Sequence, residues 1–572
     1  MESAIEEACL QNELNVWLAR NEIMWRQKSR ETWLKDGDCN SKFFHISSII
    51  HRKKNSIDAI RGDNGEWIVK LSEIREFVIE KFHNLFIEED ITFPKDLGNL
   101  ITPIILEDRN SLLYQIPTAK EIREVLFSMQ SQKALGSDGL PPLFYKRYWF
   151  VVGSSVIQAV QKIFSSGKLL GELNNSYIVL IPKTPNPSAI NHFRPISLCN
   201  TVYKIIFKLI VRRLRTVLPN LISPCQSAFI LGRWIAKNQL IVQELLHSFK
   251  KRKVKGRFVA LKLDLQKAYD HINWGFLKSV LAKFGFNHTF IGWIMECVST
   301  ISFSILVNGG KSKHFKPTRG LWQGDPLSPY LFIICQEVLS RMIEREFLNG
   351  KIHGVKMNLA GLAFTHVMYA GDIMIFAKTN SREIKILDEC LYNYYSWSEQ
   401  LINRDKSGII FSKSVQRDKR REIKHILLIK KIQPHASYLG APLFQTSSRK
   451  KDFSFLQDKL EARLLGWRSK ALSWAGKATM IRAKALALPT YTFSSYDVPI
   501  VVWDKMDASI HRFWWKPNKD SGRYLACRAW DDICAPKVKG GLGFRKLKRN
   551  ILMKHYCLSW HGWLFPSKTA HA

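Results

Sequence analysis

The amino-acid sequence predicts an α+β fold in which a layered central domain has a helical region on each side. Two patterns support this prediction. Short runs of β-type residues alternate with long helical patterns through the middle of the chain, and both ends carry apolar residues at helical spacing among charges. A third observation, the strong positive charge of the chain, concerns its partner rather than its fold.

The first part of the chain is predicted to be mainly helical. Residues 1 to about 60 place Leu and Trp at roughly helical spacing, and the stretches 72–86 and 119–130 have the same periodicity. The segment GDNGEW at 62–67 predicts a turn, and KALGSDGLPP at 133–142 predicts a loop because it is dense in Gly and Pro.

The middle of the chain contains the predicted strands. SYIVLIPK at 176–183 is a short β-rich run, a long helical pattern covers 202–218, and FVALKLDL at 258–265 alternates as a strand does. HVMYAGDIMIFA at 366–377 has two apolar β-type runs around an Ala-Gly-Asp tip, and Gly beside Asp favours a tight turn, so we predict a β-hairpin. From residue 444 onward the pattern is helical and basic.

The composition indicates a polyanionic partner. Of 572 residues, 86 are Lys or Arg and 49 are Asp or Glu, which gives a net charge of +37 and a pI near 9.8. Nucleic acid is the first candidate partner and an anionic membrane surface the second. The apolar stretches, such as 330–335, are far shorter than the ~20 residues of a membrane span. We therefore expect no membrane partner.

The N-terminus and the cysteines indicate the compartment. The N-terminus is acidic and polar, unlike a signal peptide. Ten Cys are scattered without C-x-x-C spacing, which favours neither a disulfide framework nor a zinc ribbon. We expect a reducing compartment, the nucleus or the cytosol.

Asp264 and Asp372 are the candidate metal ligands. Polymerase-type phosphoryl transfer uses two magnesium ions ~4 Å apart, and magnesium prefers hard carboxylate oxygens. Asp264 ends a predicted strand and Asp372 lies at the tip of the predicted hairpin. Each Asp taken alone fits a turn or capping role better than a catalytic one.

A series of ordered motifs resembles the reverse transcriptase of plant LINE-type (non-LTR) retrotransposons over nearly the whole chain. These motifs are KALGSDGLPPLFYKRYW (133–149), LIPK (180–183), NHFRPISLCNTVYKII (191–206), QSAFILGR (226–233), KLDLQKAYDHINW (262–274), RGLWQGDPLSPYLF (319–332), QLINRDKSGIIF (400–411) and YLGAPL (438–443). The flanks agree as well, at 25–45, 466–481 and 536–544. The resemblance implies a right-hand polymerase of fingers, palm and thumb with an antiparallel palm sheet.

The resemblance also implies roles for single residues. Asp264 matches the first metal ligand of the palm. Tyr269 matches the aromatic residue that contacts the incoming sugar and selects against a 2′-hydroxyl. Lys183 and Arg194 match basic fingers residues near the triphosphate or template.

Two further motifs carry implied roles. Gln323 and Gly324 match the turn that rests against the template strand, and Lys406 matches the lysine that protonates the pyrophosphate leaving group. The partners implied are an RNA template, a DNA primer and deoxynucleoside triphosphates, with two Mg²⁺ ions as cofactors. No obligate protein partner is inferred.

The sequence departs from the family at the hairpin. The family has Tyr-Ala-Asp-Asp or Phe-Ala-Asp-Asp there, whereas this chain has Tyr369-Ala370-Gly371-Asp372. Glycine has no side-chain oxygen, so the position of the third ligand is empty and metal binding is expected to suffer. A second departure is Trp322, where the family usually has Arg beside the template turn.

The predicted domains are a helical region at 1–132, fingers and palm at 133–443 with a core at about 164–443, and a basic, thumb-like region at 444–572. The resemblance implies that the first region linked the polymerase to a lost endonuclease and that the last is truncated.

Two functions remain open: an RNA-directed DNA polymerase impaired at Gly371, and a catalytically dead remnant that only binds nucleic acid. A maturase or telomerase relative fits the flanks at 25–45 and 536–544 less well.

Overall fold

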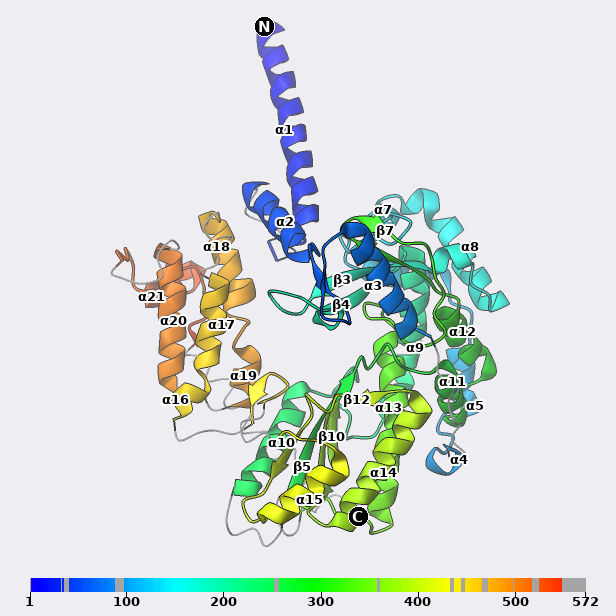
Figure 1. The fold of residues 1–572 in the computed structure, drawn as a ribbon. Helices are drawn as coiled ribbons and strands as arrows, with labels where there is room; N and C mark the ends of the chain where they lie inside the picture. The colour runs from blue at the N-terminus through cyan, green and yellow to red at the C-terminus, as the bar shows by residue number, and fades with distance from the viewer. Residues whose placement is uncertain are drawn as a thin grey trace, which may run out of the picture. The chain divides into compact units, whose positions relative to one another are not determined.

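The chain divides into two compact units. A computed structural model describes residues 2–31, 33–34, 41–87, 97–250, 257–356, 361–432, 437–443, 448–464, 472–496, 498–516 and 524–547. One unit joins residues 1–54 to 440–572, and the other contains residues 55–439. Figure 1 gives the course of the chain in both units.

These boundaries differ from the predicted division after residues 132 and 443. Residues 55–132 belong to the central unit because their apolar side chains enter its cores. Leu100 and Ile122 pack in the core under the larger sheet, and Ile74 and Val78 pack with the strands of the smaller one. Helical periodicity identifies such segments but not the core that they join.

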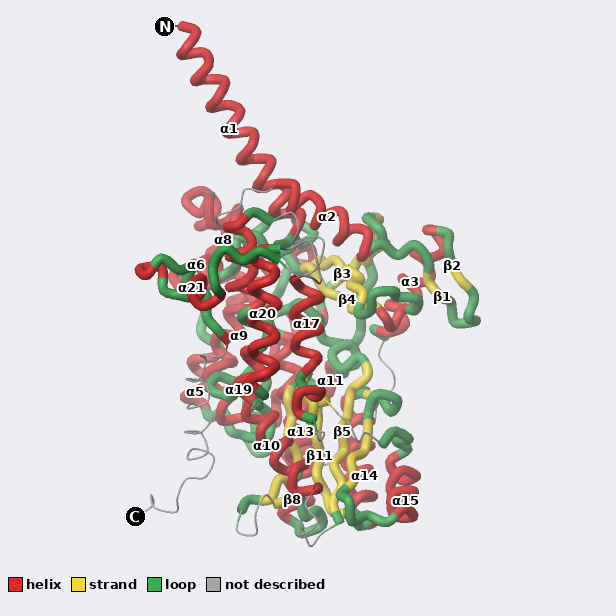
Figure 2. The backbone as a smooth tube through the Cα atoms, turned by 90° about the vertical axis from the view of Figure 1, so that its left-hand side faces the viewer, coloured by secondary structure: helices red, strands yellow, loops and turns green. Residues whose placement is uncertain are grey.

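The larger sheet has five strands and is antiparallel throughout. It consists of β10 (His366–Tyr369), β11 (Asp372–Lys378), β5 (Phe258–Gln266), β12 (Leu401–Ile402) and β13 (Gly408–Phe411). The strand order is β10-β11-β5-β12, and β13 also pairs with β5. Figure 2 shows β5 and β11 side by side. The structure confirms the predicted strand at 258–265 and the hairpin at 366–377.

The smaller sheet has four strands in the order β4-β3-β6-β7. These are β3 (Asn175–Pro182), β4 (Phe193–Leu198), β6 (Ser302–Val307) and β7 (Gly310–Lys311). The strands β3 and β6 are parallel, and the other neighbours are antiparallel. The predicted strand at 176–183 is β3.

Helices surround the two sheets of the central unit. The predicted helices 119–130 and 202–218 are present as α6 and α9, and α6 begins with a capping box of Thr118 and Glu121. The helices of this unit are α3 (Leu71–Leu85), α4 (Leu97–Leu100), α5 (Glu107–Leu113), α6 (Ala119–Ser128), α7 (Pro142–Arg147), α8 (Trp149–Ser166), α9 (Thr201–Leu221), α10 (Ile235–Lys250), α11 (Trp274–Lys283), α12 (His288–Ser299), α13 (Ser328–Leu348), α14 (Ser381–Ser398) and α15 (Arg417–Leu427).

The remaining strands of the described residues form three short pairs. β1 (Ile60–Arg61) pairs with β2 (Trp67–Ile68), and β8 (Val355–Lys356) pairs with β9 (Ala363–Phe364). The predicted turn at 62–67 connects β1 to β2. The strands β14 (Ser437–Tyr438) and β15 (Ala441–Pro442) follow the larger sheet in the chain.

Apart from β15, the other unit is helical in the residues that the structure describes. Its helices are α1 (Glu2–Ser29), α2 (Ser41–Asn55), α16 (Arg449–Asp452), α17 (Ser454–Leu464), α18 (Trp474–Met480), α19 (Thr490–Ser495), α20 (Ile500–Trp515) and α21 (Trp530–Cys534). The predicted helix over 1–60 is therefore two helices. The core of this unit is rich in aromatic side chains, and Phe493 stacks on Trp503 there. Across the described residues, no helix is both long and apolar enough to cross a membrane.

Candidate active site

Asp264 and Asp372 lie opposite each other on adjacent antiparallel strands. Asp264 of β5 pairs in register with Asp372, the first residue of β11. Directly opposed residues in an antiparallel pair have Cβ atoms ~4.5–5.5 Å apart, so the two carboxylates lie close together as the sequence predicted. Both side chains are half-buried. Such a carboxylate pair attracts a divalent cation.

The charge environment of Asp372 is consistent with a cation site. Burial raises the pKa of Asp372, the Lys262 ammonium group lowers it, and the negative charge of Asp264 raises it again. The repulsion between two neighbouring carboxylates is relieved when a cation or a proton binds between them. Within the described residues, no group of three or more His, Cys, Asp and Glu side chains could hold a metal ion.

The hairpin tip does not need a glycine at position 371. Tyr369 pairs with Asp372, so Ala370 and Gly371 form the two-residue turn. Ala370 is the residue with a positive φ, 48°, whereas Gly371 has none. A Cβ atom built on Gly371 would have one neighbour within 4 Å, the Cβ of Ala268 at 3.9 Å, which is ordinary contact. An aspartate therefore fits this position without backbone strain.

Three other cations lie around Lys183, which directly follows β3. Loss of solvent lowers the pKa of Lys183, and the charges of Lys406, Arg194 and Lys267 lower it further. The Lys183 ammonium group donates to the main-chain oxygen of Asn191, 3.0 Å away. We call Lys183, Arg194, Lys267 and Lys406 the cation cluster. A concentration of positive charge like this suits a polyphosphate.

The loop that carries Lys406 is bonded directly to the strand that carries Asp264. The main-chain N–H of Asn403 donates to the main-chain oxygen of Asp264 at 2.8 Å, and the main-chain N–H of Asp264 donates to the Ser407 hydroxyl at 3.1 Å. The Asn403 side chain also accepts from the N–H of Lys406. The structure thus brings two of the predicted site residues, Asp264 and Lys406, into one hydrogen-bonded unit.

Two residues near this site were not predicted from the sequence. Lys267 belongs to the cation cluster, and Asp270 is buried beside it with 3% of its surface exposed. Burial raises the pKa of Asp270 to about 7, although Lys267 and Lys183 both act to lower it. In the sequence, only their positions three and six residues after Asp264 could have indicated a role in the site. Such positions are equally expected of residues in a turn that follows the strand.

Tyr269 lies against the core beside the cluster. Its ring stacks on Phe332 of α13 with centroids 4.6 Å apart, and burial raises the pKa of its hydroxyl to about 12. The main-chain oxygen of Tyr269 accepts from the N–H of Leu321 at 2.8 Å. Tyr269 is therefore held rigidly next to the loop that follows Arg319.

The turn at Gln323 and Gly324 lies against β4. The N–H of Ser197 donates to the oxygen of Gln323 at 2.7 Å. Gly324 has φ of 105°, and a Cβ there would lie 2.8 Å from the Ser197 oxygen. Glycine is required at this position by both the backbone conformation and the close approach of a neighbouring strand.

Trp322 is a core residue, which changes the meaning of the second departure from the family pattern. Its side chain is 2% exposed. The ring makes edge contacts with Phe86, Trp274 and Phe303. A tryptophan here fills the hydrophobic core below the smaller sheet. It does not present an altered surface to a template.

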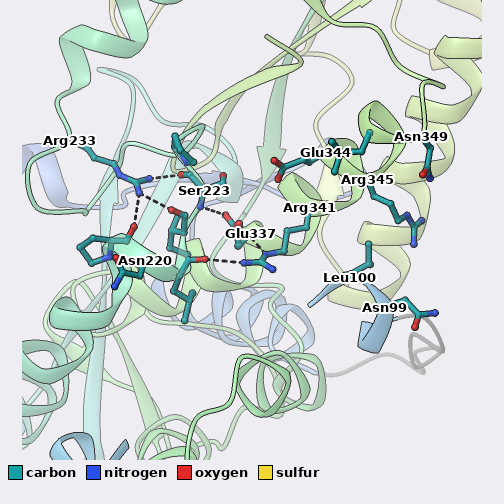
Figure 3. A pocket seen from close by; sticks show the side chains of 15 residues that line it. Asn99, Leu100, Asn220, Ser223, Arg233, Glu337, Arg341, Glu344, Arg345 and Asn349 are labelled. Atoms are coloured by element: carbon teal, nitrogen blue, oxygen red, sulfur yellow. Dashed lines mark hydrogen bonds and ion pairs between the residues drawn. The ribbon is translucent and has the colours of Figure 1, made fainter. Parts of the chain in front are cut away.

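A separate pocket lies beside the loop that follows α9. Its volume is about 510 Å³, and Figure 3 shows its lining, which includes Arg233, Glu337 and Arg341. Burial raises the pKa of Glu337 to about 7, and hydrogen bonds from Ser223 and Arg341 counteract this effect. None of the site residues predicted from the sequence is among those that line this pocket.

Comparison with known proteins finds proteins that are similar to this chain. Residues 181–456 match the family described as reverse transcriptase (RNA-dependent DNA polymerase). The chain is 26% identical over 460 residues to an uncharacterized 149 kDa protein of transposon TX1 from Xenopus laevis, covering 79% of this chain and 34% of that protein. It is 27% identical over 290 residues to the Pol polyprotein of the type-2 retrotransposable element R2DM from Drosophila melanogaster, covering 50% and 26%.

A shorter stretch of the chain is similar to a plant protein. The chain is 29% identical over 122 residues to a putative ribonuclease H protein from Arabidopsis thaliana, which covers 21% of this chain and 19% of that protein. The chain spans about a third of the length of the Xenopus relative and about a quarter of the Drosophila one.

Proposed function

We propose that this chain, which carries the reverse transcriptase domain of a non-LTR retrotransposon in the fold of a right-hand polymerase, is built for RNA-directed DNA synthesis and is impaired at one metal ligand. The observation that carries this proposal is the register of β5 and β11, which sets Asp264 opposite Asp372. Gly371 immediately precedes Asp372 in the turn between β10 and β11, and we propose that it occupies the position of the missing carboxylate.

The residues present fit one divalent cation better than two. Magnesium in such sites is held by one or two carboxylates together with substrate phosphates. Asp264 and Asp372 supply that set for one shared ion. A second ion ~4 Å away would need the oxygen that an aspartate at position 371 would supply. When bound, the ions would stabilise the charge that develops on the transferred phosphoryl group.

The proposed substrates follow from the residues around the carboxylates. The cation cluster of Lys183, Arg194, Lys267 and Lys406 would bind the triphosphate of a deoxynucleotide. Tyr269 would lie below its sugar, and Lys406 would hold the proton that the leaving pyrophosphate takes up. An RNA template and a DNA primer would bind through phosphate contacts to the basic surfaces of the chain.

We further propose that the element is of the plant LINE type, with activity in the nucleus or the cytosol. The flanks at 25–45 and 536–544 support this assignment, as does the similarity to an Arabidopsis protein.

A primer-extension assay tests the proposed function. The chain as it stands and its Gly371→Asp variant would be compared on an RNA template with a DNA primer, in Mg²⁺ and in Mn²⁺. We expect the variant to be at least 100-fold more active, because losing one preorganised charge-stabilising group in an enzyme costs about 10²–10³ in rate. The turn accepts the aspartate, since a Cβ there meets only ordinary contact.

The control is Asp264→Asn in the Gly371→Asp background, which should abolish the gain because both carboxylates act on the same ions. Equal incorporation by the original chain and the Gly371→Asp variant would contradict the assignment of Gly371 as the lesion. If the original chain and the Gly371→Asp variant are both inactive but bind primer and template, the alternative function is correct, and the chain is a remnant that only binds nucleic acid.

A further inference from the structure

The outer edge of the hairpin strand β10 is covered by a short segment from a distant part of the sequence. We call residues 225–228 the anchor segment. The N–H of Met368 donates to the oxygen of Cys225 at 2.8 Å, and the N–H of Ser227 donates to the oxygen of Met368 at 3.1 Å. Gln226 and Met368 thereby form an isolated parallel bridge. The anchor segment therefore continues the sheet beyond β10.

The side chain of Gln226 reaches past this bridge to the tip of the hairpin. Its Oε1 atom accepts from the N–H of Ala370 at 3.0 Å and from the N–H of Ala228 at 3.0 Å. Its Nε2 atom donates to Oε1 of Gln336 in α13 at 3.1 Å. Gln226 is 2% exposed. One buried amide therefore joins the anchor segment, α13 and the turn of the hairpin.

The turn needs such support because of its backbone conformation. Ala370 has φ of 48°, a left-handed conformation that costs a non-glycine residue free energy and persists only where the surroundings hold it. The hydrogen bond that the Gln226 side chain accepts comes from the main-chain N–H of Ala370 itself. Asp372 is two residues further on and starts β11, so the position of the turn decides where its carboxylate is presented to Asp264.

The anchor segment is itself held from the side of the pocket in Figure 3. The Arg233 guanidinium group donates to the main-chain oxygens of Gln226 at 2.6 Å, Ile222 at 2.7 Å and Pro219 at 3.2 Å, and also to that of Ser223. Asn238 adds a bond from its Nδ2 atom to the oxygen of Met368 at 2.7 Å. Side-chain hydrogen bonds from Arg233 and Asn238 thus hold the segment that supports the turn.

We propose that Gln226 is a positioning residue, whose side-chain amide fixes the turn at Ala370 and thereby the place at which the Asp372 carboxylate meets Asp264. This inference rests on the proposed function for the chemistry at Asp372. The contacts that support it are independent of that function.

Hydrogen exchange on the full chain tests the contact directly. Gln226→Met keeps the length of the side chain and removes its acceptor. We expect the peptide that spans residues 366–373 to exchange at least about fivefold faster, because the N–H of Ala370 loses a buried partner. Gln226→Glu should keep the slow exchange, since a carboxylate accepts the same two N–H groups and Nε2 of Gln336, which has no partner in the structure, can turn to donate to it.

Metal binding tests the consequence for Asp372. In the Gly371→Asp background, calorimetry with Mn²⁺ alone should give a dissociation constant about 10-fold higher for Gln226→Met than for its parent. Gln226→Glu should stay within a few fold of the parent. The affinity for a primer–template duplex should be the same in all three proteins, because none of the changes alters the basic surface.

Asn110→Leu is the matched control. Asn110 is another buried amide, 4% exposed, that donates to Gly285 and accepts from Asn287. Its loss should lower stability without changing exchange at residues 366–373 or the Mn²⁺ dissociation constant. Unchanged exchange in Gln226→Met would overturn the inference, and so would faster exchange with unaltered Mn²⁺ affinity. If the Gly371→Asp parent itself binds no Mn²⁺, the proposed function fails, and the exchange result still decides whether Gln226 holds the turn.

Discussion

Position 322 illustrates how a single residue acquires a different meaning in the folded chain. As a departure from the family pattern beside a template-binding turn, Trp322 was a candidate for a second lesion. In the structure its indole fills the core shared by Phe86, Phe303 and the strands of the smaller sheet. At the residue scale, therefore, Trp322 contributes packing, and Gly371 remains the departure that we propose as the lesion.

Restoring the family residue at position 322 should be harmful. We expect Trp322→Arg to lower the free energy of unfolding by about 3 kcal/mol or more, because it removes a large buried ring and buries a charge. Urea denaturation followed by circular dichroism would measure this. Stability equal to that of the original chain would show that the side chain at 322 reaches solvent.

Asp270 should make stability depend on pH. Its folded pKa, about 7, is above that of an unfolded aspartate, so the folded state binds one more proton than the unfolded state between about pH 4 and pH 7. Stability from this group is present at low pH and is lost as the pH rises through 7. We expect Asp270→Asn to flatten this decline and to stabilise the protein at pH 8 by more than ~1 kcal/mol. An unchanged slope between pH 5 and pH 8 would count against this account.

At the element scale, the site is assembled from ends of elements. The carboxylates come from the end of β5 and the start of β11, Lys183 follows β3, Arg194 lies in β4, and Lys406 lies between β12 and β13. Because hydrogen-bonded strands fix the register of their neighbours, β5 and β11 set Asp264 opposite Asp372. The loop at 403–407 is bonded on both sides to Asp264.

Two lysines of the cation cluster should have separable kinetic effects. In the Gly371→Asp background, Lys183→Met should raise KM for the deoxynucleotide about 10-fold with little change in kcat, because it removes a charge that binds the triphosphate throughout the reaction. Lys406→Met should mainly lower kcat, since its proposed proton transfer occurs only in the transition state. Steady-state kinetics would distinguish the two, and the same loss in both parameters for both variants would contradict separate roles.

At the scale of the whole molecule, charge is the dominant feature. The net charge of +37 is spread over both units and is far beyond what folding needs. We expect this charge to add a general attraction for nucleic acid to the specific geometry around Asp264 and Asp372. Either proposed function, catalytic or binding only, uses this attraction.

Binding should therefore depend steeply on salt. Titration of the full chain with an RNA–DNA duplex should give log K linear in log salt, with a loss of about 10³-fold or more between 50 and 200 mM if six or more phosphates are contacted. Duplexes of unrelated sequence should bind about equally, because phosphate contacts carry no base information. Flat affinity across this range, or tight binding of one sequence alone, would contradict the account.

The local sequence pattern was sufficient to predict many of the helices and strands. The hairpin at 366–377, the strand at 258–265 and the helices predicted at 119–130 and 202–218 follow from alternation, turn residues and helical periodicity, which depend on neighbours in the chain. The antiparallel pairing of Asp264 with Asp372 was predicted through the ordered motifs. The domain boundaries were not, because residues 55–132 join the central cores through contacts that no local period encodes.

By itself, the sequence determined the type of the helices and strands that have strong periodicity, the two facing carboxylates and the glycine that interrupts their motif. It also determined the positive charge from which we expect binding to nucleic acid. Only the tertiary structure decided that position 371 accepts an aspartate, that Trp322 is core, that Lys267 and Asp270 lie beside Lys183, and that Gln226 holds the turn. The physical reason is separation along the chain. Gln226 and Ala370 are 144 residues apart, and a hydrogen bond over that distance depends on the packing of every element between them.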